Sequence, residues 1–164
     1  MIIRIIALLF MSLASFSQSP VGAWERFYEN ENGTEIRSVV IFSEKFQSIA
    51  MFNAKSGEFI YSNGGTWELD GNMMTEVVEF DTANSERVGN VVTFEVNITN
   101  DKLSIPESDW HFSRIDDGKP GDLNGAWLMS GRYRNGEKQI RNTDRPRKTM
   151  KILSGTRFQW IAFD

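Results

Sequence analysis

Residues 90–98, with the sequence NVVTFEVNI, alternate between two kinds of side chain. The even-numbered side chains from Val92 to Ile98 are all apolar, whereas the odd-numbered ones from Thr93 to Asn97 are polar. Successive side chains of a β-strand point to opposite faces, so a period of two predicts a strand with one buried face. This stretch is the clearest sign of the fold, and the segments on either side of it follow the same rule.

Seven further segments with strand character lie between short turns, and none has sustained helical periodicity. The turns include Asn-Gly and Asp-Gly pairs, which tolerate the positive φ of hairpin turns, so consecutive strands should pair antiparallel. A meander with one apolar face protects its edges best by closing on itself. We therefore expect an all-β fold that begins with an antiparallel, up-and-down, eight-stranded barrel. The seven segments are residues 24–29, 34–42, 46–52, 58–69, 73–80, 102–104 and 109–115.

The composition agrees with a folded β protein. Hydrophobic residues make up 40% of the 164 residues and charged residues 24%, which excludes a disordered chain and a polytopic membrane protein. The chain has 12 Phe, 5 Trp and 3 Tyr, together with 13 Gly and only 4 Pro. Aromatic residues favour strands and glycine favours tight turns.

Residues 1–17 are typical of a cleavable signal peptide. Arg4 precedes an apolar run, and small residues occupy the recognition positions at Ser15 and Ser17. The run is shorter than the roughly 20 residues that span a bilayer, so we expect no stable membrane anchor after cleavage. The mature protein is predicted to be secreted or periplasmic. It contains no cysteine, so burial rather than disulfide bonds must stabilise it.

An internal repeat divides the mature chain. Gly22-Ala23-Trp24 recurs as Gly125-Ala126-Trp127, and residues 46–50 recur as 158–162 at an offset larger by eight or nine residues. Residues 18–118 are then the complete barrel domain, and residues 119–164 are the truncated start of a second copy. Three strands do not close a barrel. We expect either a fragment of a longer two-domain protein or a remnant that packs on the barrel or on another chain.

Charge differs strongly between these two parts. Residues 18–118 carry 7 Lys and Arg against 18 Asp and Glu, a net charge of −11, whereas residues 119–164 carry 10 against 4, a net charge of +6. The two parts should attract each other. The basic stretch from Arg141 to Lys151 is interpreted as a solvated loop, and nucleic acid is not an expected partner of an exported acidic protein.

Gly22-Ala23-Trp24 at the start of the first strand, and Arg114 on the last, resemble the lipocalin superfamily. The run Gly64-Gly65-Thr66-Trp67, followed by Asp-Gly-Asn, is similar to lipocalin-like domains of secreted bacterial proteins. The resemblance implies that Trp24 plugs the closed end of the barrel and that Arg114 lies across its ring. An arginine in that place stacks on the indole and binds carbonyl groups.

Alternation from Trp24 predicts which side chains face the interior and bind a small hydrophobic or amphipathic ligand. An inward arginine must be paired or hydrated, so Arg26 would meet a ligand carboxylate. Ser48, Ala50 and Phe52 are predicted to share the inner face with Phe46. The alternative is a structural or protein-interaction module whose barrel is filled by side chains. The predicted ligand-binding residues are Arg26, Tyr28, Phe46, Trp67, Phe94, Trp110 and Phe112.

We expect neither catalysis nor a cofactor or metal. His111 is the only histidine and is predicted to face outward, and the carboxylates show no ligand spacing. Glu76 and Glu79 fall on opposite strand faces and do not form an acid–base pair. No Gly-x-Ser-x-Gly motif is present in the sequence. An enzyme would need Glu76 or Glu79 inside a cavity beside Arg26.

Overall fold

A computed structural model describes residues 19–117, 119 and 121–164. The predicted signal peptide, residues 1–17, lies outside the described residues, as do positions 118 and 120 at the predicted domain boundary. The described chain is all-β, with fourteen strands and two short 3-10 turns, η1 (Ser85–Arg87) and η2 (Pro106–Ser108). The expected all-β class is therefore confirmed.

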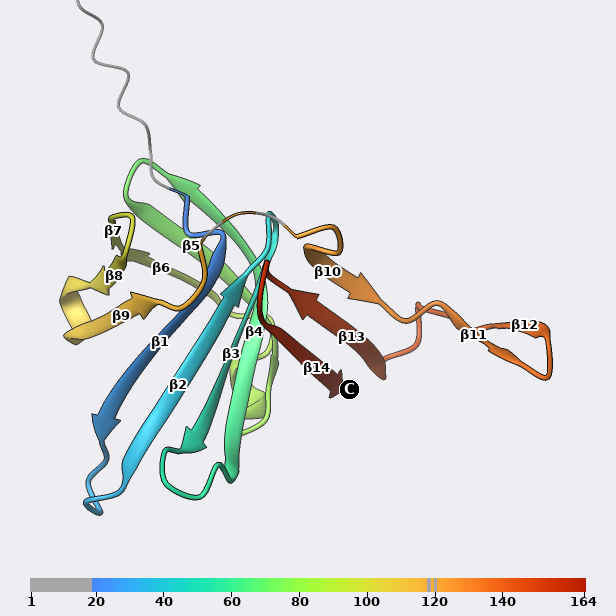
Figure 1. Ribbon diagram of the computed structural model, residues 1–164, viewed down its shortest axis with the longest axis horizontal. Coiled ribbons are helices and arrows are strands. Elements are labelled where there is room, and N and C mark those ends of the chain that lie inside the picture. Colours follow the sequence, from blue (N-terminus) through green and yellow to red (C-terminus); the bar gives the residue numbers. More distant parts are fainter. Residues whose placement is uncertain (1–18, 118, 120) are drawn as a thin grey trace, which may run out of the picture.

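The first nine strands form one antiparallel sheet that curves into a nearly closed barrel (Figure 1). Consecutive strands are neighbours from β1 to β6, and β1 also pairs with β9. Hairpin connections account for this order, since each short turn returns the chain beside the strand it has just left. The strands are β1 (Gly22–Glu29), β2 (Glu35–Phe42), β3 (Phe46–Asn53), β4 (Phe59–Asp70), β5 (Met73–Asp81), β6 (Val91–Glu95), β7 (Asn97–Ile98), β8 (Lys102–Ile105) and β9 (Trp110–Arg114).

The barrel has nine strands instead of the predicted eight because the segment 90–98 is interrupted at Val96. β6 pairs with β5, whereas β7 pairs with β8 on the other side. The Val96 amide donates to the Asn72 carbonyl, and the Val96 side chain is buried in the core. One continuous stretch of sequence thus supplies β6 and β7, the two edge strands of the sheet. Because Val96 directly connects them, the two edges lie close together.

Two glycines let β4 and β5 approach closely. The register between these strands shifts between Gly64 and Gly65, which pair with Phe80 and Val78. A Cβ at Gly65 would overlap the Val77 carbonyl oxygen and would lie 2.8 Å from the Glu79 nitrogen. The irregularity reverses the alternation of β5, so Glu76 lines the interior while Phe80 joins a cluster on the outer face.

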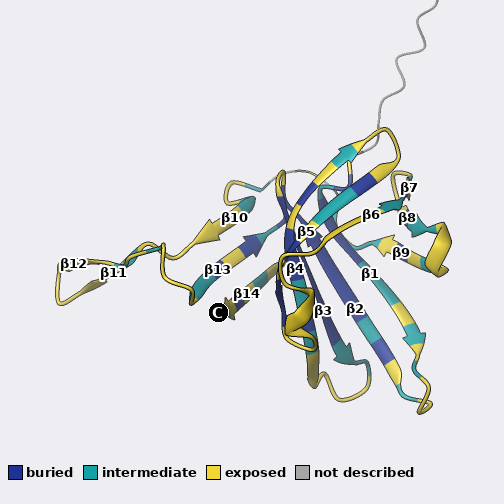
Figure 2. Ribbon diagram, turned by 180° about the vertical axis from the view of Figure 1, so that it is seen from behind, coloured by how far each residue is buried: buried dark blue, intermediate teal, exposed yellow. Residues whose placement is uncertain are grey.

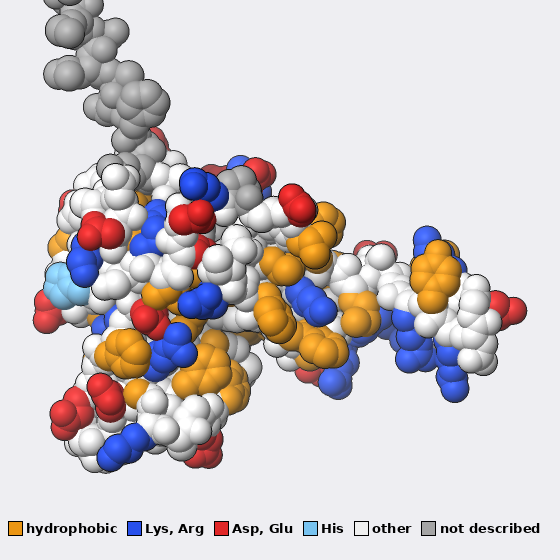
Figure 3. Space-filling model, viewed as in Figure 1, with side chains coloured by type: hydrophobic (Ala, Val, Ile, Leu, Met, Phe, Trp, Pro, Cys, Tyr) orange, Lys and Arg blue, Asp and Glu red, His pale blue; other side chains and the backbone are white. Residues whose placement is uncertain are grey.

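The remaining strands form a second, smaller unit beside the barrel (Figure 1). β10 (Gly125–Leu128), β13 (Lys148–Leu153) and β14 (Phe158–Phe163) form a three-stranded sheet. β11 (Gly131–Arg134) and β12 (Glu137–Ile140) form a hairpin that projects away from the barrel. Figure 3 shows basic side chains along this projection and hydrophobic ones over β10, β13 and β14.

The small sheet packs on the outer face of the barrel through a second apolar cluster. Ile41 and Ile152 are fully buried there, and the rings of Phe80 and Phe163 stack with centroids 4.8 Å apart. The Ser48 hydroxyl donates to Gln159 Oε1 at 2.6 Å. As a result, β2 and β3 are buried along most of their length (Figure 2).

The two units share one pattern of strand pairing. Gly22 pairs with Phe42, and Phe42 with Gln47; Gly125 pairs with Leu153, and Leu153 with Phe158. The position in β3 that corresponds to Phe158 is therefore Gln47. The prediction that matched Phe158 with Phe46 was wrong by one residue.

The prediction for the faces of β3 was also wrong. Phe46 belongs to the outer cluster, and Ser48 bonds to the small sheet. Ala50 and Phe52 line a groove shared with β14. In β3, apolar residues occur at even and at odd positions because both faces of the strand are covered. Such a strand lacks the alternation of apolar and polar residues from which its inner face could be predicted. Gln47, Ile49 and Met51 face inward instead.

Candidate functional site

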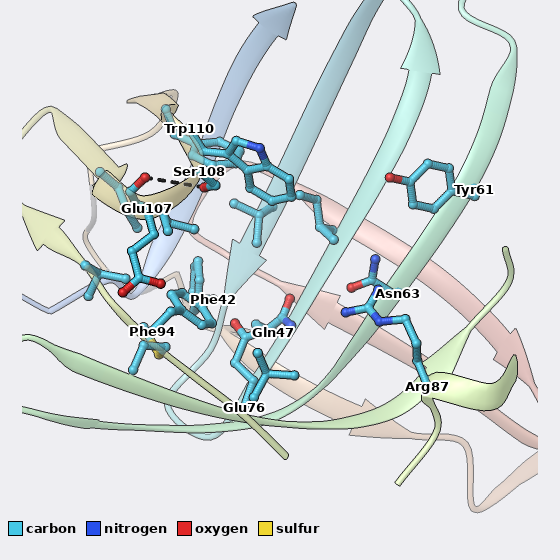
Figure 4. A pocket seen from close by; sticks show the side chains of 18 residues that line it. Phe42, Gln47, Tyr61, Asn63, Glu76, Arg87, Phe94, Glu107, Ser108 and Trp110 are labelled. Carbon is cyan, nitrogen blue, oxygen red and sulfur yellow. Dashed lines mark hydrogen bonds between the residues drawn. The ribbon is translucent and has the colours of Figure 1, made fainter. Parts of the chain in front are cut away.

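The interior of the barrel holds a cavity of about 300 Å³ that is open to solvent on one side. Strands β2 to β6, β8 and β9 contribute to its wall, and the turns η1 and η2 flank it. Figure 4 shows side chains from these elements pointing toward a common space. The lining residues are Val40, Phe42, Gln47, Ile49, Tyr61, Asn63, Met74, Glu76, Arg87, Val92, Phe94, Val96, Leu103, Ile105, Glu107, Ser108, Trp110 and Phe112.

Most of the wall is apolar. Phe94, Trp110 and Phe112, three of the predicted ligand-binding residues, line it together. Trp110 and Phe112 make an edge-to-face contact with centroids 6.2 Å apart, which holds both rings in place. Phe42 contributes a further ring and contacts Trp67 edge-to-face at 5.7 Å. This wall suits an aliphatic or aromatic ligand body.

One carboxyl group lies inside this apolar surface. Glu76 projects from β5 into the cavity near Gln47 (Figure 4). Burial raises the pKa of Glu76 to about 7, against the positive charge of Arg87 and a hydrogen bond from Gln47, which both lower it. The Gln47 side chain is 4% exposed, and its Oε1 has no hydrogen-bond partner among the described residues. Glu76 and Gln47 thus present acceptor oxygens in the cavity.

The Arg87 side chain reaches the cavity from η1, but its guanidinium group already forms a salt bridge. Its Nη1 donates to Asp81 Oδ2 at 2.8 Å, and the Asp81 side chain is almost completely buried. The other oxygen of Asp81 accepts from the amides of Ala83 and Asn84, which fixes the turn that carries Arg87. Asp81 therefore positions Arg87 and neutralises much of its charge.

Arg26 and Tyr28 lie inside the barrel as predicted, yet neither lines the cavity. The Arg26 guanidinium carbon is 4.2 Å from the ring centroids of both Tyr28 and Trp110, and 5.6 Å from that of Phe112. Burial lowers the pKa of Arg26. Aromatic faces thus accommodate this cation, so the expectation that Arg26 meets a ligand carboxylate receives no support from its position.

Trp24 and Arg114 meet at one end of the barrel, as the resemblance implied. The guanidinium carbon of Arg114 lies 3.9 Å from the Trp24 ring centroid. Arg114 also donates to the carbonyls of Asn100, at 2.7 Å, and Val21, at 2.9 Å. Trp67 lies in the same core cluster as Trp24, and its indole donates to the Ser43 carbonyl at 3.0 Å. Trp67 therefore packs in the core and does not line the cavity.

Phe46 is the predicted ligand-binding residue that lies outside the barrel, for the reason given for β3. Sequence reasoning considered Glu76 but missed the other polar residues of the cavity. Gln47 was assigned to the wrong face, and the turns that carry Arg87, Glu107 and Ser108 have no periodicity that predicts their direction. Tyr61 and Asn63 lie on the alternating segment 58–69, and counting back from Trp67 would have found them.

The remaining candidate groups lie apart from the cavity. Glu79 is exposed at the strand irregularity, whereas Glu76 lies inside, and the cation near Glu76 is Arg87 rather than Arg26. His111 is exposed and contacts Asp109 at 2.9 Å. In the described part of the chain, no three His, Cys, Asp or Glu side chains gather closely enough to hold a metal ion.

Comparison of the chain with protein-family models, curated proteins and solved structures finds no match. Within residues 19–117, 119 and 121–164, no helix has the length and apolar character needed to cross a membrane.

Proposed function

We propose that this protein is a secreted, non-catalytic β-barrel that binds a small hydrophobic or amphipathic ligand inside the barrel. The observation that carries the proposal is the cavity of about 300 Å³, walled by Phe42, Phe94, Trp110 and Phe112. Its size is at the lower limit of small-molecule sites, roughly 300 to 1,000 Å³, and its few polar groups are clustered. The lipocalin-like character of residues 18–118 is part of this proposal.

The alternative is an interaction module with a filled barrel. It requires side chains to occupy the interior, and the cavity favours ligand binding over it. The stacking of Arg114 on Trp24 also supports the lipocalin-like interpretation, because the resemblance implies this pair at the closed end of the barrel.

Filling the cavity with a larger side chain should weaken ligand binding. Val92 lines the cavity and pairs with Glu76, so Val92→Phe would put a ring where the ligand body lies. We expect the affinity for octanol, measured by isothermal titration calorimetry, to fall at least about tenfold, because that corresponds to 1.4 kcal/mol of lost contact.

Val91→Phe is the matched control. Val91 precedes Val92 on β6 but points to the other face and is 63% exposed, so this variant should bind octanol like the unchanged protein. Equal binding by both variants, with the unchanged protein binding at one site, would show that the ligand lies elsewhere.

We further propose that residues 119–164 correspond to the first strands of a second barrel copy. The matching registers of β1–β2–β3 and β10–β13–β14 support this interpretation. The indole of Trp24 donates to the carbonyl of Pro20, and the indole of Trp127 donates to that of Leu123, four residues back in each case. Gly22 and Gly125, two residues before each tryptophan, both have positive φ.

Engineered cysteines test this register, and the chain contains no native cysteine to interfere. Trp127 and Lys151 are paired on β10 and β13, as Trp24 and Val40 are on β1 and β2. The double variant Trp127→Cys, Lys151→Cys should therefore oxidise to a disulfide, detected by a mobility shift that a reductant reverses.

The comparison variant carries Trp127→Cys with Ile152→Cys. Side chains one residue along a strand point to the opposite face, so this pair should stay reduced. Preferential oxidation of the shifted pair would contradict the second-copy register.

A further inference from the structure

The charged groups around the cavity are not equivalent. Arg87 is paired with Asp81, and Arg26 is stacked against three aromatic rings away from the cavity wall. Glu76 forms no salt bridge among the described residues, and Glu107 is exposed on η2. Among the described residues that line the cavity, Glu76 thus has no ion-pair partner, and the one cation, Arg87, is already paired. Arg26, whose Nε has no hydrogen-bond partner in the described part of the chain, does not line the cavity.

A second observation points to the same kind of ligand group. Gln47 is more than nine-tenths buried, and its Oε1 faces no donor among the described residues. A buried acceptor without a partner destabilises the protein unless a ligand or water supplies the donor. Gln47 lies beside Glu76, so one ligand group with several N–H donors would satisfy both side chains (Figure 4).

We propose that the ligand is a cationic amphiphile, with a protonated amine held by Glu76 and Gln47 and an apolar body packed against Phe42, Phe94 and Trp110. This inference rests on the proposed function, because it specifies the ligand class of the same cavity. An ammonium group carries three donors and no acceptor, which matches two adjacent acceptor oxygens.

The charge of the barrel favours the same choice. Residues 18–118 carry a net charge of −11, which the +6 of residues 119–164 offsets only in part, so a cation is attracted to the protein and an anion is repelled. An alkanoate of equal length would bring its carboxylate toward Glu76, with only the already paired Arg87 to compensate it. A fatty acid is therefore the disfavoured amphiphile.

Three probes with the same chain length separate the head group from the body: octylamine, octanol and octanoate. Titration calorimetry at pH 8.5 and moderate salt should give the order octylamine, octanol, octanoate, each at one site. A hydrogen bond to a charged group is stronger than one between neutral groups, so octylamine should bind at least about tenfold more tightly than octanol.

Glu76→Gln should remove this preference by lowering octylamine affinity about tenfold while leaving octanol binding within about threefold. Glu68→Gln is the matched control, since Glu68 is an exposed carboxylate on β4, facing away from the cavity. It should preserve the preference, which separates a local effect of Glu76 from the general acidity of the domain.

The pH dependence supplies an independent readout. The alkylammonium stays protonated below pH 10, as lysine does. Glu76, with a pKa of about 7, loses its charge as the pH falls. The groups around it are Gln47 from β3, Tyr61 and Asn63 from β4, Arg87 from η1 and Glu107 from η2. The preference for octylamine over octanol should therefore shrink between pH 8.5 and pH 5.5, and in Glu76→Gln it should stay constant.

The outcomes distinguish the two proposals. Equal affinities for octylamine and octanol, or tighter binding of octanoate, would overturn the head-group inference and leave the binding function intact. If none of the three probes binds, and Val92→Phe changes nothing, the binding function itself fails.

Discussion

Trp24→Ala should destabilise the barrel by about 3 to 5 kcal/mol, the cost of removing a large aromatic side chain from a packed core. The Trp24 side chain is fully buried, and its indole donates to the Pro20 carbonyl at 2.7 Å. Its removal also takes away the ring on which Arg114 stacks at 3.9 Å. The variant therefore loses packing, a buried hydrogen bond and a cation–π contact together.

Urea unfolding followed by circular dichroism measures this change. Trp127→Ala is the natural control, because Trp127 makes the same kind of indole hydrogen bond but is 55% exposed. We expect it to cost about 1 kcal/mol or less, as for other exposed positions. A loss below about 1 kcal/mol for Trp24→Ala would mean that this ring does not close the barrel.

Gly65→Ala should destabilise the barrel by about 3 kcal/mol or prevent folding. The added methyl group would overlap the Val77 carbonyl oxygen and crowd the Glu79 nitrogen at 2.8 Å. Both are backbone atoms of the paired strand and cannot move aside as a flexible side chain does. Overpacking in a well-packed core costs about 1 to 3 kcal/mol, and a backbone clash lies at the upper end.

Thermal unfolding compares this variant with Gly121→Ala. At Gly121 the nearest atom would be 3.4 Å from the added Cβ, which is close to ordinary van der Waals contact. The control should shift the melting temperature little. A similarly small shift for Gly65→Ala would contradict the close approach of β4 and β5.

Sequence patterns were most informative where one face of a strand is buried and the other is not. In β6, Val92 lines the cavity while Val91 is 63% exposed, and the period of two predicted this division. In β3 both faces are covered, so Phe46 and Gln47 were assigned to the wrong sides. The inner face was predicted correctly for β6 and wrongly for β3 because one face of β6 is exposed whereas both faces of β3 are covered.

The same contrast explains which parts of the cavity were predictable. Phe94, Trp110 and Phe112 lie on alternating strands, and their inward direction follows from strand geometry. Arg87 reaches the cavity from a 3-10 turn, and its direction depends on the bond to Asp81, six residues away. Glu76 was recognised only as a candidate, because burial by distant strands rather than local sequence raises its pKa.

The positions of the strands and the fold class follow from local rules, since side-chain alternation and turn residues act over a few positions in the chain. The closure of the sheet at Val96, the burial of β3 on both faces and the meeting of Gln47, Glu76 and Arg87 join segments far apart in sequence. Contacts of that kind depend on how whole strands pack against one another, so local sequence patterns do not predict them.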